Sequence, residues 1–462
     1  MSSARSLLGS LALLAVVLGS NSTVAAGQTS TSFTLANGLQ VVVLPDHRLP
    51  IVTHVVYYRA GSADDPPGQS GIAHFLEHLM FKGTKRYPTG QYDVIVTRAG
   101  GTNNAFTSTD KTYYYEQLLK DGLAKIMDLD ADRMAGLDFA PVEAEHELKV
   151  VLEERRSYDN DPESVLAGNV GRALYGKAPY AHPVLGDWAE TDALTQAAAL
   201  AFHDRFYAPA NAVLVVAGDV APDLVRSIAQ ATYGRLPAGT QPPRSWANAT
   251  PTCIEGRVEE RHERVARDKL SFYFLTPGAS GMDVHTATAL RMLADILADQ
   301  GTSPLWLDLA ARKGIASSIA VDHELRMAAG EFSITAEAEA GVSARQLEGA
   351  LHNALVKLRR AGIGLEALAE AKRHWLAGRL LGADDQLGTA TRYGEQLAIG
   401  RSIAEIENEP KAIANVSLAD VNAVLRNFLS NRCYVTALLE GTGLPPGGTP
   451  RSTPAHLKVT VH

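Results

Sequence analysis

The sequence has only two cysteines, Cys253 and Cys433, in 462 residues. A fold held together by a disulfide framework is therefore excluded, and so is a metal site built from several thiolates. A single disulfide between the two cysteines stays open, because the sequence does not show whether the sulfur atoms meet or remain two buried thiols.

The sequence also lacks an excess of positive charge. Its formal net charge is -8, its pI is near 6.0 and it contains no basic run, so we expect no nucleic-acid partner. Hydrophobic residues at 46% and charged residues at 20% are ordinary for a soluble globular protein. The length exceeds what one hydrophobic core usually supports, which predicts at least two domains.

Long apolar runs are missing except near the N-terminus. Arg5 is followed by the apolar stretch Leu7 to Leu18 and then by Val24-Ala25-Ala26, the three parts of a signal peptide. The stretch is shorter than the ~20 residues of a membrane-spanning helix, although a retained anchor is the alternative. We predict a signal peptide over residues 1–26 and a mature, periplasmic protein without a membrane span.

The rest of the chain divides into two similar halves. Both run from strands through helices to a final apolar strand, and a Pro-rich polar segment lies between them. The predicted helices include Leu118 to Ala131 in the first half and Leu305 to Lys313 in the second. This order predicts an α+β fold of two homologous α/β-sandwich halves, each a mixed, largely antiparallel sheet packed with helices. The predicted parts are an N-terminal domain (27–235), a linker (236–255), a homologous C-terminal domain (256–444) and a flexible tail (445–462).

The segment His74-Phe75-Leu76-Glu77-His78 carries the chemistry. It lies in an amphipathic stretch after Gly71 that should be helical, and residues four apart on a helix share one face, so both imidazoles can reach one ion. Glu77 is displaced around the helix and can approach a water molecule without ligating the metal. The alternative is that the two histidines bind no metal and are solvated or cap a helix. The other histidines, among them His54 and His203, have no partner at ligand spacing and are expected to be structural or exposed.

A third ligand should come from the acidic helix predicted over Pro141 to Tyr158. Two histidines and one carboxylate leave a position for water, as catalytic zinc sites do. Glu147 and Glu154 are nearly in line on one helical face, but the pattern alone does not choose between Glu147, Glu153 and Glu154.

The chain resembles the pitrilysin/insulinase family of zinc peptidases with an inverted His-x-x-Glu-His motif. The likeness covers nearly the whole mature chain and most resembles the branch of mitochondrial processing peptidase and its bacterial relatives. The matching segments are Asn37-Gly38-Leu39, Gly71 to Gly83, Gly100 to Thr107, Tyr180-x-His182-Pro183-x-x-Gly186 and Asn211 to Gly218.

The resemblance implies a site and a substrate. His74, His78 and Glu154 would bind one zinc ion per chain, Glu77 would be the general base, and Glu147 would orient one of the histidines. The segment Asn103 to Tyr115 reads as a strand, and in relatives it is an edge to which a peptide adds. Asn103, Asn104, Ala105 and Phe106 are therefore expected to bind substrate, with an ordinary core strand as the alternative.

One departure from the family pattern concerns a second pair of residues. Active relatives use an Arg and a Tyr seven apart from a C-terminal half, and here those positions hold Ala310 and Ser317. Arg312 is close, but on an α-helix it would be turned about 200° away. We therefore expect a heterodimer with a homologous subunit that lacks the zinc motif, with a homodimer as the alternative. A peptide-binding or scaffold subunit that holds zinc without turnover is the second functional hypothesis.

Overall fold

The computed structural model describes residues 30–244, 246, 254–429 and 433–442. The described residues do not include the predicted signal peptide or the predicted tail. They also leave out residues 247–253 of the predicted linker, among them Cys253. Cys433 is described and is disulfide-bonded. No helix in the described ranges has the length and apolar character needed to cross a membrane.

The first half builds a six-stranded sheet in the order β1-β2-β6-β3-β5-β4. Its β2–β6 pair is parallel and its other pairs are antiparallel, which leaves β1 and β4 at the edges. The strands are β1 (Thr31–Thr34), β2 (Gln40–Pro45), β3 (Ile51–Tyr58), β4 (Thr102–Thr107), β5 (Thr112–Leu119) and β6 (Ala212–Gly218). The helices are α1 (Ile72–Leu79), α2 (Gln91–Arg98), α3 (Leu123–Ala135), α4 (Pro141–Asp159), α5 (Pro162–Tyr175), α6 (Trp188–Asp192), α7 (Gln196–Phe206) and α8 (Pro222–Ala231).

The second half repeats this plan with a five-stranded sheet in the order β7-β11-β8-β10-β9. The last strand, β11, pairs parallel with β7 and antiparallel with β8, as β6 does with β2 and β3. The strands are β7 (Gly256–His262), β8 (Lys269–Pro277), β9 (Ala316–Glu324), β10 (Ala329–Ala338) and β11 (Val435–Gly441). The helices are α9 (Val284–Ala298), α10 (Pro304–Trp306), α11 (Ala344–Ala361), α12 (Leu365–Leu381), α13 (Gln386–Ala398), α14 (Ile403–Asn415) and α15 (Leu418–Phe428). The predicted two-half architecture with mixed, largely antiparallel sheets is confirmed.

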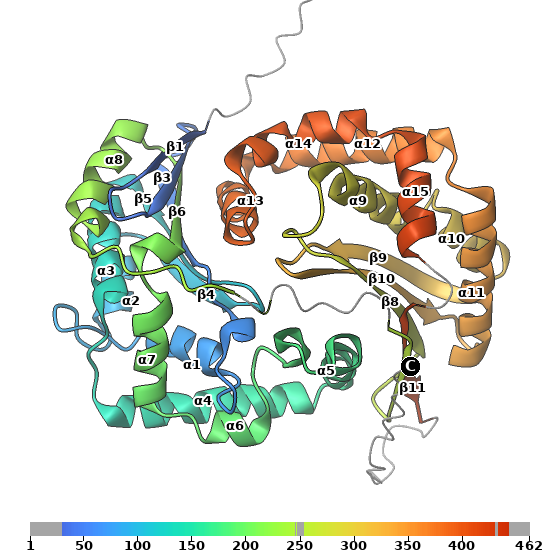
Figure 1. The fold of residues 1–462 in the computed structure, drawn as a ribbon, viewed down its shortest axis with the longest axis horizontal. Helices are drawn as coiled ribbons and strands as arrows, with labels where there is room; N and C mark the ends of the chain where they lie inside the picture. The colour runs from blue at the N-terminus through green and yellow to red at the C-terminus, as the bar shows by residue number, and fades with distance from the viewer. Residues whose placement is uncertain (1–29, 245, 247–253, 430–432, 443–462) are drawn as a thin grey trace, which may run out of the picture.

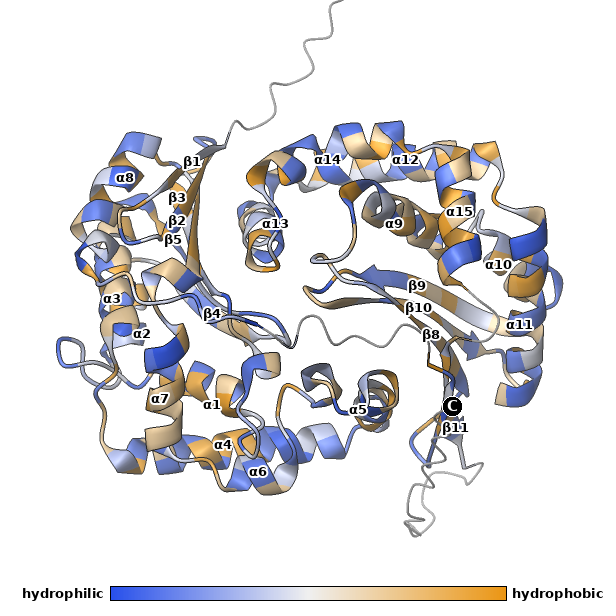
Figure 2. Ribbon diagram, viewed as in Figure 1, coloured by the Kyte–Doolittle hydropathy of each residue, from blue (hydrophilic) through white to orange (hydrophobic). Residues whose placement is uncertain are grey.

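Each half covers one face of the other half's sheet. Helix α13 of the second half packs on β3 and β6, and helix α5 of the first half packs on β7 and β11 (Figure 1). Strand β6, which is buried on both faces, is hydrophobic along its whole length rather than alternating, as the colouring of this strand shows (Figure 2). On α13 and the start of α14, Tyr393, Leu397 and Ile406 are buried against this sheet. Burying each such side chain contributes about 1.5–3 kcal/mol, so this interface is part of the core.

Three predicted elements differ from the structure. Residues 103–115 are two strands, not one, because Ser108 donates its N–H to the carbonyl of Lys111 and closes a turn. The helix predicted from Leu118 begins at Leu123, since Leu118 and Leu119 complete β5. The helix predicted over 305–313 is the short α10 followed by a π-helix, Leu307–Arg312.

Candidate functional site

Helix α1 presents one apolar face to the core and one polar face to α4. Its residues Ile72, Ala73, Phe75, Leu76 and Leu79 are buried in the core of the first half. The remaining positions, which include His74, Glu77 and His78, are partly exposed on the other side. The amphipathic pattern therefore fixes which way the motif faces.

The start of α1 is held by two features. Gly71 has a φ of +90°, and a Cβ there would lie 2.9 Å from the carbonyl oxygen of Leu185, so both the conformation and the space favour glycine. The carboxylate of Asp65 accepts the N–H groups of Gly71 and Ala73 at 2.7 and 3.1 Å. Asp65 thus satisfies donors at the helix N-terminus that would otherwise lack partners. Sequence reasoning missed this residue, because it lies outside the usual capping spacing.

Helix α4 brings two of the three candidate glutamates to α1. The Glu154 Oε2 atom lies 3.5 Å from His74 Nε2 and 3.4 Å from His78 Nε2. Glu147 Oε1 lies 2.9 Å from Nδ1 of His78, the other ring nitrogen. Glu153 points away, exposed and paired with Arg156. The structure therefore gives Glu147, Glu153 and Glu154 different surroundings, whereas the sequence pattern did not choose between them.

The geometry of His74, His78 and Glu154 suits one divalent ion. Their three ligand atoms lie within 4.8 Å of one another. Ligand atoms bound at ~2.0–2.2 Å around a tetrahedral zinc ion stand roughly 3.3 Å apart, close to the two distances from Glu154. Imidazole nitrogens and a carboxylate oxygen are also the donor types that zinc accepts. These residues fit the metal that the sequence pattern predicts.

The charge states of the two histidines differ. Burial lowers the pKa of His74 to about 4, so its ring is neutral near pH 7 and can ligate a metal. Burial works in the same direction on His78, but Glu147 and Glu154 outweigh it and raise its pKa to about 9. A proton on His78 thus balances the two carboxylates without metal, and metal binding would release it.

Glu77 is held by a residue to which the sequence pattern assigned no role. The hydroxyl of Thr107, the last residue of β4, donates a hydrogen bond of 2.5 Å to Glu77 Oε2. Burial raises the pKa of Glu77, and the Thr107 hydroxyl opposes this rise by stabilising the charged carboxylate. The only sequence signal for Thr107 was its place at the end of the Gly100 to Thr107 segment.

The four predicted substrate residues lie on β4, which is an edge strand. Ala105 is buried on the core-facing side, while Asn104 is exposed and Phe106 is 49% exposed. The Phe106 ring stacks on Tyr113 of β5 at 5.4 Å. Asn103 donates its side-chain N–H to Asp93 at 3.3 Å. The structure thus brings Thr107, beside the substrate candidates, to the general-base candidate.

Ala310 and Ser317 lie in the second half and take no part in this cluster. Ser317, on β9, places its hydroxyl 3.4 Å from the carbonyl oxygen of Glu337. Arg312 is exposed and pairs with Asp308 at 2.8 Å. Because this segment is a π-helix, the rotation of about 200° expected for Arg312 on an α-helix does not apply. The guanidinium of Arg312 is nevertheless paired with a carboxylate of the same helix.

A second group of ionisable residues lies in the core of the first half. His54 Nδ1 is 2.8 Å from Glu116 and 3.4 Å from Asp130. The guanidinium of Arg133 contacts both of these carboxylates and supplies the positive charge a metal would bring. The prediction that His54 is structural agrees with this arrangement.

Comparisons with known proteins extend this description. A family model described as "Insulinase (Peptidase family M16)" matches residues 40–187, and one described as "Peptidase M16 inactive domain" matches residues 193–374. An uncharacterized zinc protease of Mycobacterium tuberculosis is 31% identical over 93% of this chain and 96% of its own length. The zinc protease PqqE of Helicobacter pylori is 28% identical over 88% of this chain and 92% of its own length.

Solved structures agree with these relatives. The crystal structure of a protease from Helicobacter pylori matches with a TM-score of 0.82 and 26% identity, covering 89% of this chain and all of that one. The periplasmic protease PqqL of Escherichia coli shares the fold, with a TM-score of 0.74 at 17% identity, and this chain covers 51% of its length. With both halves matched by family models and a relative 31% identical over almost its full length, the chain belongs to the insulinase family, peptidase family M16.

Proposed function

We propose that this chain is a zinc-dependent endopeptidase in which His74, His78 and Glu154 hold one zinc ion and Glu77 is the general base. The convergence of these side chains at the α1–α4 contact carries the proposal. Zinc in such a site acts as a Lewis acid that polarises a carbonyl and lowers the pKa of water.

Glu77 would move the proton. It takes a proton from the attacking water and returns it to the leaving amine, so that one carboxylate serves as base and then as acid. Its burial, which raises its pKa, suits a group that must hold the proton between the two steps. Glu147 accepts the Nδ1–H of His78 and fixes the tautomer whose Nε2 faces Glu154.

The substrate would be a peptide or an unfolded segment that binds as an added strand on β4. An edge strand offers unpaired backbone N–H and C=O groups, and an extended peptide can pair with them whatever its sequence. Asn103 would help to bind the peptide, Asn104 and Ala105 would lie near the scissile bond, and the half-exposed Phe106 ring would contact an apolar side chain. A folded protein cannot supply such a free strand.

The chain would work with a homologous subunit that lacks the zinc motif and supplies the absent Arg and Tyr, with a homodimer as the alternative. The support is chemical: neither Ala310 nor Ser317 can stabilise an oxyanion as a guanidinium and a phenol do. Export to the periplasm rests on the leader pattern of residues 1–26, and PqqL of Escherichia coli, which shares the fold, is a periplasmic protease.

A quenched peptide library separates this proposal from its rival, a subunit that holds zinc and peptide without turnover. Cleavage by the wild type and by Glu77→Gln is compared, each with and without proteins that copurify from the native host, and bound zinc is measured. We expect cleavage by the wild type with partner and none by Glu77→Gln at equal zinc content. A wild type that binds zinc and peptides but cleaves nothing with any copurifying protein would favour the rival.

A further inference from the structure

The two halves correspond along the helices that flank the metal candidates. Helices α5 and α13 each begin after an aspartate N-cap, Asp161 and Asp385. Helices α4 and α12 each precede these caps and begin at the same distance from them. Counting back from the caps, Glu147 and Glu154 of α4 correspond to Ala371 and Gly378 of α12.

Helices α1 and α9 correspond in the same way. The buried residues Ala289, Leu290, Met292, Leu293 and Ile296 of α9 repeat the spacing of the buried residues of α1. This register places Arg291 at the position of His74 and Asp295 at the position of His78. The second half therefore has none of the metal-candidate side chains at the corresponding positions, although it has the two corresponding helices.

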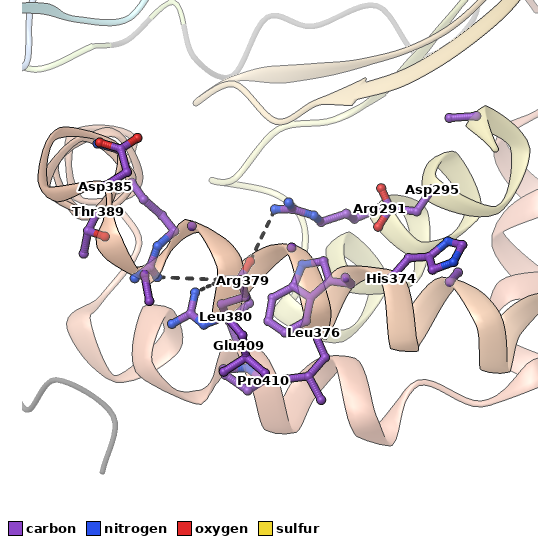
Figure 3. Close-up of a pocket in the computed structure, with 18 of the residues that line it drawn as sticks. Arg291, Asp295, His374, Leu376, Arg379, Leu380, Asp385, Thr389, Glu409 and Pro410 are labelled. Atoms are coloured by element: carbon purple, nitrogen blue, oxygen red, sulfur yellow. Dashed lines mark hydrogen bonds and ion pairs between the residues drawn. The ribbon is translucent and has the colours of Figure 1, made fainter. Parts of the chain in front are cut away.

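A cavity of about 1180 Å³ opens where these side chains are lost (Figure 3). Arg291, Asp295, Ala371 and Gly378 all line it. A Cβ built on Gly378 would meet no atom within 4 Å, so this position faces open space. Glycine in a helix interior costs stability relative to alanine, and nothing in the packing around Gly378 requires it.

The cavity contains groups of both charges whose pairing is incomplete. Arg291, Arg379 and Arg392 come from three different helices and surround one carboxylate, Glu409, at 3.4, 3.4 and 3.9 Å (Figure 3). Among the described residues, Nη1 of the Arg392 guanidinium is buried without a hydrogen-bond partner. Charged donors buried in this way are costly unless a further acceptor reaches them.

Two of the acidic side chains in the cavity also lack partners among the described residues. Within the part of the chain that the structure describes, Asp295 and Glu370 line the cavity and make neither a hydrogen bond nor a close ion pair. Burial raises the pKa of Asp295, and the charge of Arg291 offsets this rise only in part. The other acidic lining residues are occupied: Asp299 and Asp385 accept backbone N–H groups, and Glu407 accepts the hydroxyl of Ser30.

An apolar wall completes the lining. Trp375, Leu376 and Leu380 of α12 line the cavity, and the two leucines are 50% and 65% exposed. A ligand that matches this lining needs an anionic group, a cationic group and an apolar part between or beside them.

We propose that this cavity binds a short free peptide of two or three residues, with its carboxylate on the arginines around Glu409 and its ammonium group on Asp295 or Glu370. At ~3.3–3.6 Å per residue, such a peptide extends over roughly 7–11 Å, a size that the cavity accommodates. Its apolar side chains lie on Trp375 and the leucines. The choice of ligand rests on the proposed function, because hydrolysis by this chain would release short peptides with free termini.

Calorimetric titration of full-length protein with alanyl-leucine tests the proposal. The Glu77→Gln background prevents turnover, so binding is measured independently of whether the chain is a peptidase, and wild-type cleavage of the library is scored separately. We expect saturable binding that weakens about tenfold or more when the dipeptide is N-acetylated or C-amidated, since each change removes a charge-assisted contact.

Two variants and one control variant test where the dipeptide binds. Gly378→Leu fills the cavity and should abolish binding, whereas Gly349→Leu makes the same change in an open, exposed position of α11 outside the cavity and should not. In Arg392→Gln the free and C-amidated dipeptides should bind equally. Thermal unfolding of each variant shows that it is folded. No saturable binding, equal binding of capped and free dipeptides to the parent, or binding that survives Gly378→Leu would each overturn the proposal.

Discussion

The hydroxyl of Thr107 should control the rate of the chemical step. Thr107→Val keeps the branched shape of the side chain and removes the donor that holds Glu77, whose carboxylate is buried. A hydrogen bond to a charged group contributes about 1.5–3 kcal/mol, and each ~1.4 kcal/mol is a factor of ten in rate. If losing the bond misplaces the carboxylate so that its full worth is lost in the transition state and not in the ground state, kcat should fall roughly 10- to 150-fold.

The assay is steady-state cleavage of a quenched peptide together with the zinc content of each protein. We expect kcat to fall while KM and zinc content stay unchanged, because Thr107 contacts neither the metal candidates nor the exposed face of β4. Thr107→Ser keeps the donor and should restore most of the rate. Thr102→Val, at the exposed start of the same strand, is the matched control. An unchanged kcat in Thr107→Val, or a loss of zinc equal to the loss of rate, would refute the reasoning.

Three further changes probe other parts of the molecule. Glu147→Gln removes the charge that orients His78, so the zinc dissociation constant should rise about 10- to 100-fold in a chelator competition, and an unchanged constant would contradict the assigned role. Gly394→Val should lower the melting temperature, at a cost of about 1–3 kcal/mol or more, because a Cβ at Gly394 would lie 2.0 Å from the Tyr57 ring; an unchanged melting temperature would argue against the packing of α13 on β3. Burial tends to raise the pKa of Asp128, but the hydrogen bond from Arg86 and neighbouring groups lower it to about 2, so its stabilisation exists above the ordinary pKa near 3.8 and fades as the pH falls toward 2. Urea unfolding of Asp128→Asn should therefore show a loss of about 1 kcal/mol at pH 7 that becomes small near pH 2.

The sequence predicted those parts of the site whose geometry is set within a single helix. One helical turn fixes how His74, Glu77 and His78 face, so their spacing was enough. The choice between Glu153 and Glu154 depended on how α4 lies over α1, which no pattern within α4 contains. Thr107 and Asp65 act across contacts between separate elements, and residue spacing carries no signal for such contacts.

The same limit applies to the fold. The sequence predicted a final apolar strand in each half, Ala212 to Gly218 in the first, but not what covers each face of the sheet. One face is covered by α13, which lies far along the chain in the other half. The turn between β4 and β5 was missed because Ser108 to Lys111 contains no glycine or proline, the strongest turn signals, although Ser108 and Asp110 are both common in turns.

That turn also explains why a half without metal-binding residues matters to the site. The side chain of Asp110 accepts the hydroxyl of Tyr180 at 2.5 Å and the N–H of Met327, in the β9–β10 hairpin of the second half, at 2.8 Å. Arg244, in the predicted linker, donates to the Asp110 carbonyl at 2.6 Å. Strand β4 pairs with β5 alone among the described strands, so its far end would be weakly held without these contacts. Because Thr107 ends β4, the hairpin that holds Asp110 also holds the hydroxyl that positions Glu77.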